Sequence, residues 1–111
     1  MTNEEILKGL SGVFYLATSE DSQPHVRPFD KAAEVNGKIY IATSANKRVF
    51  QQILENPKIE IFALGDFGVT RFMAEAYEED NEKIIKEAYA KMEKDFSEDK
   101  VALRLERIRK A

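Results

Sequence analysis

Apolar residues recur at every second position along much of this chain, the spacing that predicts β-strands. The run at residues 13–18 is rich in β-branched and aromatic residues, which predicts a strand buried on both faces. Pro28 lacks an N–H for the ladder, so the second strand is expected at a sheet edge or at a bulge. In all, strands are expected at residues 13–18, 25–29, 31–35, 38–43, 58–64 and 69–77, with a last one around residues 101–107.

Three segments with helical spacing interrupt these strands. Thr2 and Glu5 have the spacing of a capping box that begins a short first helix. Residues 48–55 predict a second helix that ends at Asn56-Pro57, and Asp80 or Asn81 is expected to cap a third. The apolar face of the second helix is expected to hold Val49, Phe50, Ile53 and Leu54, and that of the third Ile84, Ile85, Ala88, Tyr89 and Met92.

Short turns join the strands and favour an antiparallel arrangement. Asn36-Gly37 supplies the two positive-φ residues that a type I′ hairpin turn requires, and residues 65–68 predict another turn. A series of strands with few helices indicates an antiparallel sheet, and closure into a barrel would remove most of its edges. The expected fold is therefore a mainly β barrel with flanking helices, formed by a single domain over residues 1–111.

Composition narrows the classes of protein that fit this pattern. Apolar residues make up 43% and charged residues 33%, which is typical of a folded globular chain. The absence of cysteine excludes disulfides and thiolate metal sites. The first residues are polar and acidic, and no stretch approaches the ~20 apolar residues of a membrane span. We therefore expect a cytoplasmic protein that does not contact a membrane.

The distribution of charge says more than its sum. The net charge of −3 argues against nucleic acid as a partner, because such binding depends on neutralising phosphates. Residues 24–58 hold six basic and three acidic side chains, whereas residues 75–99 hold ten acidic and four basic ones. A basic first half beside an acidic helix suggests a small anionic ligand, although charge alone fits chance variation of the surface equally well.

Candidate chemistry is concentrated in residues 43–47. A strand is expected to end at Thr43 and a helix to begin near Lys47, so the N–H groups and positive dipole end of that helix would attract an anion here. Thr43, Ser44 and Lys47 can all donate to phosphate oxygens. Arg27, on a neighbouring strand, could add a forked contact.

The same segment also has a plain structural interpretation. Ser44 or Asn46 can cap the helix, and Lys47 and Arg48 would then simply be solvated cations. The lone histidine, His25, has no cysteine near it, so neither a haem nor a metal site is expected there. The acidic residues 78–80 could hold a cation, but the dipole of the following helix explains them as well.

A series of short motifs resembles the pyridoxamine 5′-phosphate oxidase-like, FMN-binding split-barrel family. The order and spacing of these motifs match over roughly residues 6–78. The motifs are Val26-Arg27-Pro28-Phe29, Asn36-Gly37-Lys38-Ile39-Tyr40, Thr43-Ser44-Ala45-Asn46-Lys47-Arg48-Val49-Phe50, Gln52-Ile53, Asn56-Pro57 and Ile59. The resemblance implies an antiparallel split barrel of six to seven strands with Greek-key topology. It also implies a homodimer with two flavin sites at its interface.

The resemblance further implies which residues bind FMN. Arg27 and Lys47 would hold the phosphate, with hydroxyl donors from Thr43 and Ser44 and a second basic contact from Arg48. Phe29 would lie near the isoalloxazine ring. Pro28 and Asn46 belong to the same cofactor-binding motifs.

The next strand carries the counterpart of the family's tryptophan-x-arginine-x-serine-glycine stretch. Here it reads Gly68-Val69-Thr70-Arg71-Phe72-Met73-Ala74, which keeps Arg71 as a cofactor-binding residue. The tryptophan is absent, and Ala74 stands in place of the glycine. These departures bear on how a flavin would stack across the dimer.

The function expected on these grounds is that of an FMN-binding oxidoreductase acting on an unknown small molecule. The alternative is a non-catalytic flavin carrier or sensor, or a cofactor-free binding module on the same fold. No catalytic residue is identified, because a flavin supplies its own chemistry, and His25 is not expected to act as a catalytic base. Dimerisation is expected independently, because the strands are expected to carry more apolar surface than one barrel can cover. The residues concerned are Phe14, Ile39, Ile41, Ile59, Ile61 and Phe72.

Overall fold

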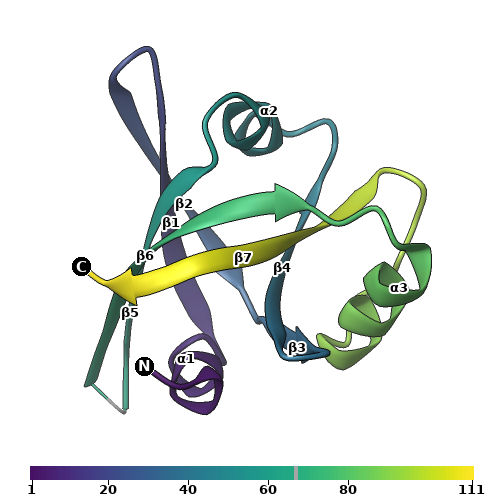
Figure 1. Cartoon of the computed structure of the whole chain (residues 1–111), viewed down its shortest axis with the longest axis horizontal. Coiled ribbons are helices and arrows are strands. Elements are labelled where there is room, and N and C mark those ends of the chain that lie inside the picture. Colours follow the sequence, from purple (N-terminus) through teal and green to yellow (C-terminus); the bar gives the residue numbers. More distant parts are fainter. Residues whose placement is uncertain (67) are drawn as a thin grey trace.

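The computed structural model describes residues 1–66 and 68–111 as one curled antiparallel sheet with three helices (Figure 1). The strand order among the described residues is β2-β1-β5-β6-β7-β4-β3. The strands are β1 (Val13–Glu20), β2 (Gln23–Asp30), β3 (Ala33–Val35), β4 (Lys38–Ser44), β5 (Lys58–Gly65), β6 (Gly68–Glu78) and β7 (Lys100–Lys110). The helices are α1 (Asn3–Gly9), α2 (Arg48–Glu55) and α3 (Glu82–Lys91).

The connections between strands give a Greek key. Hairpins join β1 to β2, β3 to β4 and β5 to β6, and α2 carries the chain from β4 across to β5. The last strand, β7, then returns to pair with both β6 and β4. The mainly β, antiparallel split-barrel fold with flanking helices is thereby confirmed.

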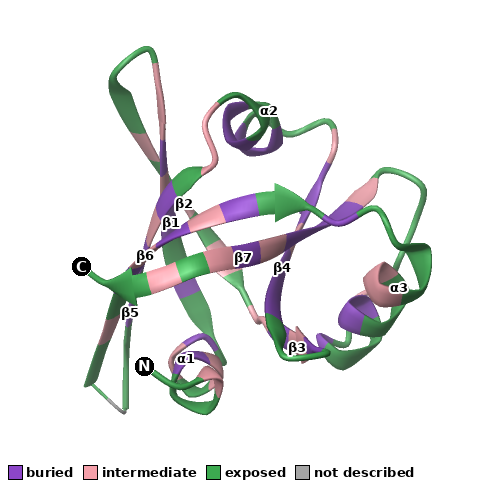
Figure 2. Cartoon of the chain, viewed as in Figure 1, coloured by how far each residue is buried: buried purple, intermediate pink, exposed green. Residues whose placement is uncertain are grey.

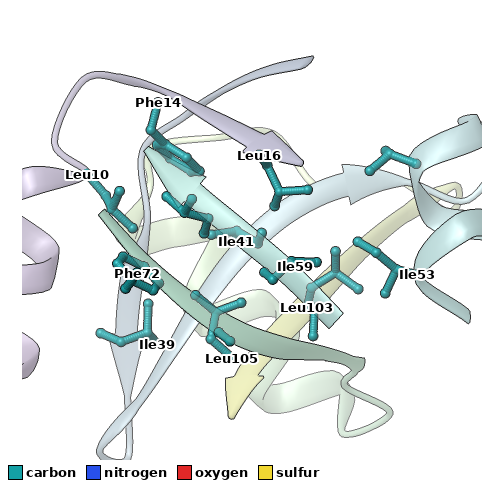
Figure 3. Close-up of a cluster of buried hydrophobic side chains, with 14 of the residues drawn as sticks. Leu10, Phe14, Leu16, Ile39, Ile41, Ile53, Ile59, Phe72, Leu103 and Leu105 are labelled. Atoms are coloured by element: carbon teal, nitrogen blue, oxygen red, sulfur yellow. The ribbon is translucent and has the colours of Figure 1, made fainter. Parts of the chain in front are cut away.

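The sheet curls around one main core. Side chains from β1, β4, β6 and β7 meet in its centre, where Phe14, Ile41, Phe72 and Leu103 are completely buried (Figure 3). Helix α1 adds Ile6, while α2 adds three apolar residues to the same cluster. Strands from both ends of the sheet thus bury their side chains against each other, as expected for a barrel.

Helix α3 covers the outside of the barrel on one side only. Tyr89 and the C-cap residue Met92 pack against Val35, Tyr40 and Ala102 in a second buried cluster. Strands β3 and β4 and the first half of β7 are consequently covered on both faces, whereas among the described residues no helix lies over the outer face of β1 and β5 (Figure 2).

This asymmetry corrects two predictions. The first strand is not buried on both faces, because Val13 and Tyr15 on its outer side are 55% and 46% exposed. The six apolar residues that we expected to need a dimer partner are all buried within the single chain. The apolar side chains that remain exposed on β1, β2, β5 and β6 are a different set, namely Val13, Tyr15, Val26, Phe62, Leu64, Val69 and Tyr77.

Local signals in the sequence are confirmed at several element ends. Thr2 and Glu5 form the capping box of α1, and Asn81 caps α3 by accepting from the N–H groups of Lys83 and Ile84. Asn36 and Gly37 have φ angles of 51° and 83°, as the hairpin turn requires. The turn expected at residues 65–68 includes residue 67, which lies outside the described residues.

Two further observations concern β2 and α2. Strand β2 lies at an edge of the sheet, as Pro28 predicts, with Pro24 and Pro28 opposite Ser19 and Tyr15. In α2 the exposed Leu54 is not part of the apolar face, and the buried polar residue Gln52 lies on that face instead. Of the helices described, none has the length and apolar character that a membrane span requires.

Candidate functional site

Two neighbouring cavities open where β4 ends and α2 begins. The smaller, of about 140 Å³, is bounded by β2 and contains Arg27; we call it the β2-side cavity. The larger, of about 310 Å³, is bounded by the start of β7 and contains Lys100; we call it the β7-side cavity. The two share four lining residues: Ala42, Thr43, Lys47 and Lys94.

Most of the predicted site residues meet at these cavities. Arg27, Pro28 and Phe29 approach from β2, Thr43 and Ser44 from the end of β4, and Lys47 from the start of α2. Asn46, Arg48 and Arg71 line neither cavity.

The N-terminus of α2 faces the site without a side-chain cap. Lys47 occupies the N-cap position and makes no capping hydrogen bond, so the prediction that Ser44 or Asn46 caps the helix is wrong. The first turn also carries no acidic residue. A side-chain cap would occupy some of the free N–H groups at this end of the helix. Without one, these N–H groups and the positive end of the helix dipole remain available to an anion.

The guanidinium of Arg27 is held entirely by neutral acceptors. Its Nη1 donates to Thr18 Oγ1 at 2.9 Å and its Nη2 donates to Gln52 Oε1 at 2.6 Å. Main-chain oxygens of Leu16 and His25 accept at 3.3 and 3.4 Å. Burial lowers the pKa of Arg27, and no neighbouring charge offsets that effect. The positive charge is thus partly desolvated and lacks a carboxylate partner among the described residues.

Thr18 and Gln52 are the site residues that sequence reasoning missed on this side. Both are buried polar side chains, and Thr18 Oγ1 donates to Gln52 Oε1 at 2.6 Å. The signal for Gln52 was its place in the helix, where residue 52 shares the inward face with Ile53. A buried glutamine on that face needs polar partners, since an unpaired polar group in a core is costly.

Arg48 is engaged away from both cavities. It donates to Glu20 Oε1 at 3.2 Å, and Gln52 Nε2 donates to the same oxygen at 3.2 Å. These hydrogen bonds from Gln52 and Arg48 lower the pKa of Glu20. Arg48 therefore belongs to a surface ion pair, and the nearby Asn46 is exposed.

Arg71 lies on β6, away from the two cavities. It forms an ion pair with Glu60 across β5 and β6, with 2.7 Å between Nε and Oε2. It lines a separate cavity of about 460 Å³ between α1 and β6. Arg71 thus lies apart from the two cavities where the other predicted residues meet.

Phe29 combines a structural contact with a place in the β2-side cavity. Its ring stacks on Phe14 with 5.8 Å between centroids and 24° between planes. His25, Arg27 and Phe29 alternate with exposed residues along β2, so His25 shares a strand face with Arg27, as predicted. The side chain of His25 lines neither cavity.

Lys94 and Lys100 are basic site residues that the sequence did not reveal. Lys100 pairs in register with Ser44 across β4 and β7, and its Nζ donates to Ser44 Oγ at 3.1 Å. Lys94 follows α3 and forms an ion pair of 2.6 Å with Asp30, which lowers the pKa of that carboxyl group. Lys94 lies in the segment that charge counting identified as acidic, and only the fold places it here.

A second half-buried arginine, Arg104 on β7, lies away from these cavities. It donates to Glu79 Oε1 at 2.9 Å and to Glu106 Oε2 at 2.6 Å, and these contacts raise its pKa. Tyr40 also donates to Glu79 Oε1, at 2.8 Å. Burial and the hydrogen bond to Glu79 raise the pKa of Tyr40 to about 12.

Within residues 1–66 and 68–111 no group of three or more acidic or histidine side chains could hold a metal ion.

The sequence and structure of this chain were compared with those of known proteins. The family model of pyridoxamine 5′-phosphate oxidase matches residues 3–110. A NimC/NimA family protein from Clostridium acetobutylicum is 35% identical, with a TM-score of 0.80, and the match covers 92% of this chain and 76% of that one. No curated protein matches the sequence.

More distant structures share the fold alone. An FAD-binding protein from Mesorhizobium loti is 17% identical with a TM-score of 0.70, and the match covers 97% of this chain and 92% of that one. The heme storage protein HutZ from Vibrio cholerae is 18% identical with a TM-score of 0.67, covering 96% and 90%. The cofactors named for these two proteins differ, so the fold by itself does not specify one.

Proposed function

The chain belongs to the pyridoxamine 5′-phosphate oxidase family, and from this premise we propose that it binds FMN and acts as an oxidoreductase on a small molecule. The phosphate of FMN would lie in the β2-side cavity, at the uncapped start of α2. Arg27 and Lys47 would supply the charge there, and Thr43 a hydroxyl donor. Phe29, on the wall of the same cavity, would lie toward the ring system.

The observation that carries the proposal is the unpaired charge of Arg27. A half-buried arginine normally has a carboxylate partner, because a desolvated charge is costly when it is uncompensated. Here four neutral oxygens fix the guanidinium. The carboxylate of Glu20 accepts from Gln52 instead, and Asp30, which lines the same cavity, pairs with a lysine. An anionic ligand would provide the missing compensation. Lys47, which makes no ion pair in the described chain, would add a second cation.

The chain's own contribution to the chemistry is to bind and orient the cofactor. When bound, a flavin supplies hydride or electron transfer, so the protein needs no acid–base pair to form the reactive species. The Thr18–Gln52–Arg27 contacts would hold the guanidinium in one orientation before the ligand arrives. Such preorganisation reduces the entropy lost on binding.

We also propose a homodimer that forms through the bare outer face of the sheet. Cross-strand pairing places Tyr15 opposite both Pro28 and Phe62, and Leu64 opposite Val69, so the exposed apolar side chains form one continuous surface. Arg71 is opposite Phe62 and shares this face. A two-fold partner packed here would bring an Arg71 from each chain toward the other, which would account for its absence from the single-chain site.

Light scattering at micromolar concentration tests this assembly. Phe62→Glu places a charge in the apolar face and is expected to give a monomer. Leu54→Glu, at an exposed apolar position on α2, is the matched control and should stay dimeric. A wild-type protein that is monomeric under these conditions contradicts the proposal.

Binding of FMN and riboflavin tests the cofactor proposal, since the two ligands differ only in the phosphate. Flavin fluorescence gives both dissociation constants for the wild type and for Lys47→Ala. Loss of one charge-assisted contact should weaken FMN by about 1.5 kcal/mol, roughly tenfold, and leave riboflavin unchanged. Lys83→Ala, an exposed lysine on α3, should change neither. Equal losses for both flavins, or no binding of either, would refute the phosphate site.

A further inference from the structure

We propose that the β7-side cavity is a second anion site, which binds a phosphate group other than the one on FMN. The inference rests on the proposed function in one respect, namely that the FMN phosphate lies in the β2-side cavity. Three features of the β7-side cavity support a second anion there: its charges, its rigid walls and its separation from Arg27.

Lysines dominate the charge of this cavity. Lys47, Lys94 and Lys100 line it, and among the described residues Asp95 is its one acidic lining residue. Lys94 already forms an ion pair with a carboxylate outside this cavity, so Lys47 and Lys100 carry the uncompensated charge. Lys100 is half-buried and makes no ion pair among the described residues; its hydrogen bond goes to the neutral hydroxyl of Ser44, at 3.1 Å. A partly desolvated ammonium beside a hydroxyl is a fitting partner for phosphate oxygens, which lysine binds as a compact charge.

The wall of the cavity is fixed by main-chain hydrogen bonds. The buried hydroxyl of Tyr89 lies 3.1 Å from the main-chain oxygen of Thr43 and 2.7 Å from that of Val101. The N–H of Ala45 donates to the main-chain oxygen of Asp99 at 2.7 Å. These bonds tie the end of β4 to the start of β7, so the backbone that carries Ser44 and Lys100 is held in place without a ligand. Preorganised donors bind an anion at a lower entropic cost.

Each cavity is lined by one basic residue that does not line the other. Arg27 lines only the β2-side cavity and Lys100 only the β7-side cavity, while Lys47 and Lys94 lie between them. Together the cavities present four basic and two acidic side chains. One FMN phosphate would engage the first cavity, leaving Lys100 and Ser44 for another anion. That anion is the second phosphate of a dinucleotide flavin or the phosphate of a separate ligand.

The variant Lys100→Met tests the β7-side cavity without changing the β2-side cavity. It removes the charge of Lys100 and keeps most of the length of the side chain. Dissociation constants for FMN and FAD come from flavin fluorescence, and binding of inorganic phosphate to the FMN-loaded protein comes from phosphorus NMR. We expect FMN affinity to change by less than twofold. If the source is a dinucleotide, FAD should weaken about tenfold; if it is a separate ligand, phosphate binding to the FMN-loaded protein should weaken by that factor.

Two control variants and two contrary results complete the test of the β7-side cavity. Lys100→Arg keeps the charge and should retain most of the binding, whereas Lys83→Met should behave as the wild type. A tenfold loss of FMN itself would show that this cavity holds the flavin's own phosphate, and no effect on FAD or on inorganic phosphate would show that there is no second site; either result overturns the proposal. If the chain binds no flavin, phosphate binding to the flavin-free protein still tests Lys100, so failure of the proposed function remains distinguishable.

Discussion

Arg27 on the edge strand β2 and Arg104 on the inner strand β7 are both half-buried, but opposite kinds of partner hold them. Arg104 bonds to two carboxylates, those of Glu79 and Glu106, and its pKa is raised. Arg27 bonds only to neutral oxygens, and burial lowers its pKa. The charge of Arg104 is therefore neutralised within the fold, whereas that of Arg27 is positioned but left uncompensated. Of the two, only Arg27 is arranged to bind an external anion.

The largest effect expected from this comparison is on stability, at Arg104. Arg104→Met leaves Glu79, which is only 7% exposed, without its cation and should lower the free energy of unfolding by about 3 kcal/mol. Urea denaturation measures this, and FMN affinity of the folded protein should stay unchanged. Arg109→Met, at an exposed position on the same strand, is the control. A loss below about 1 kcal/mol would mean that Arg104 is not needed to neutralise Glu79.

A smaller stability effect is expected at Arg27, together with a loss of ligand. In Arg27→Met, Thr18 and Gln52 still bond to each other, so the unfolding free energy should fall by only about 1 kcal/mol. FMN affinity should fall at least tenfold more than riboflavin affinity, because riboflavin carries no phosphate. The comparison between the two arginines fails if the variant unfolds as readily as Arg104→Met or binds FMN normally.

The smallest effect concerns acid stability. Burial alone would raise the pKa of Glu79, but hydrogen bonds from Tyr40, from the Asn81 N–H and from Arg104 lower it below its usual value. A carboxyl group with a lowered pKa stabilises the fold above its unfolded pKa of about 4.3, and this contribution is lost as the pH falls through the lowered value.

Melting temperatures at pH 7 and below pH 4 check this prediction. The wild type should lose more stability on acidification than Glu79→Gln, by a few degrees at most. Glu4→Gln, at an exposed position on α1, should follow the wild type. Equal losses in the wild type and Glu79→Gln would remove Glu79 from the acid response.

Features coded by neighbouring residues were predictable from the sequence. The bounds of α2, the Asn36-Gly37 turn and a cap at residue 80 or 81 depend on a few consecutive residues; the structure confirms the first two and places the cap at Asn81. The predictions of burial were wrong where the burial of a strand face depends on which other element packs on it. A run such as residues 13–18 does not itself indicate that α3 packs on the opposite side of the barrel and leaves Tyr15 exposed.

The candidate site shows the same limit. The motif around residues 43–47 identified one end of β4, but Lys100 reaches Ser44 only through the register of β4 with β7. Gln52 was not predicted as a site residue, because its hydrogen bonds with Thr18 and Arg27 join α2 to β1 and β2. Pairing of Arg48 with Glu20 likewise depends on how close α2 lies to β1. Such contacts join residues distant in sequence, and spacing along the chain does not encode them.

The two prolines of β2 have a consequence for self-association. N–H groups of alternate residues in a strand point to the same side, and a proline is tolerated where that side faces away from the neighbouring strand. Pro24 and Pro28 therefore remove two of the donors that β2 would offer to an incoming strand, and the opposite edge, β3, is only three residues long. Both ends of the sheet resist extension by a further copy of the chain, which guards against fibrous aggregation while leaving face-to-face contact open.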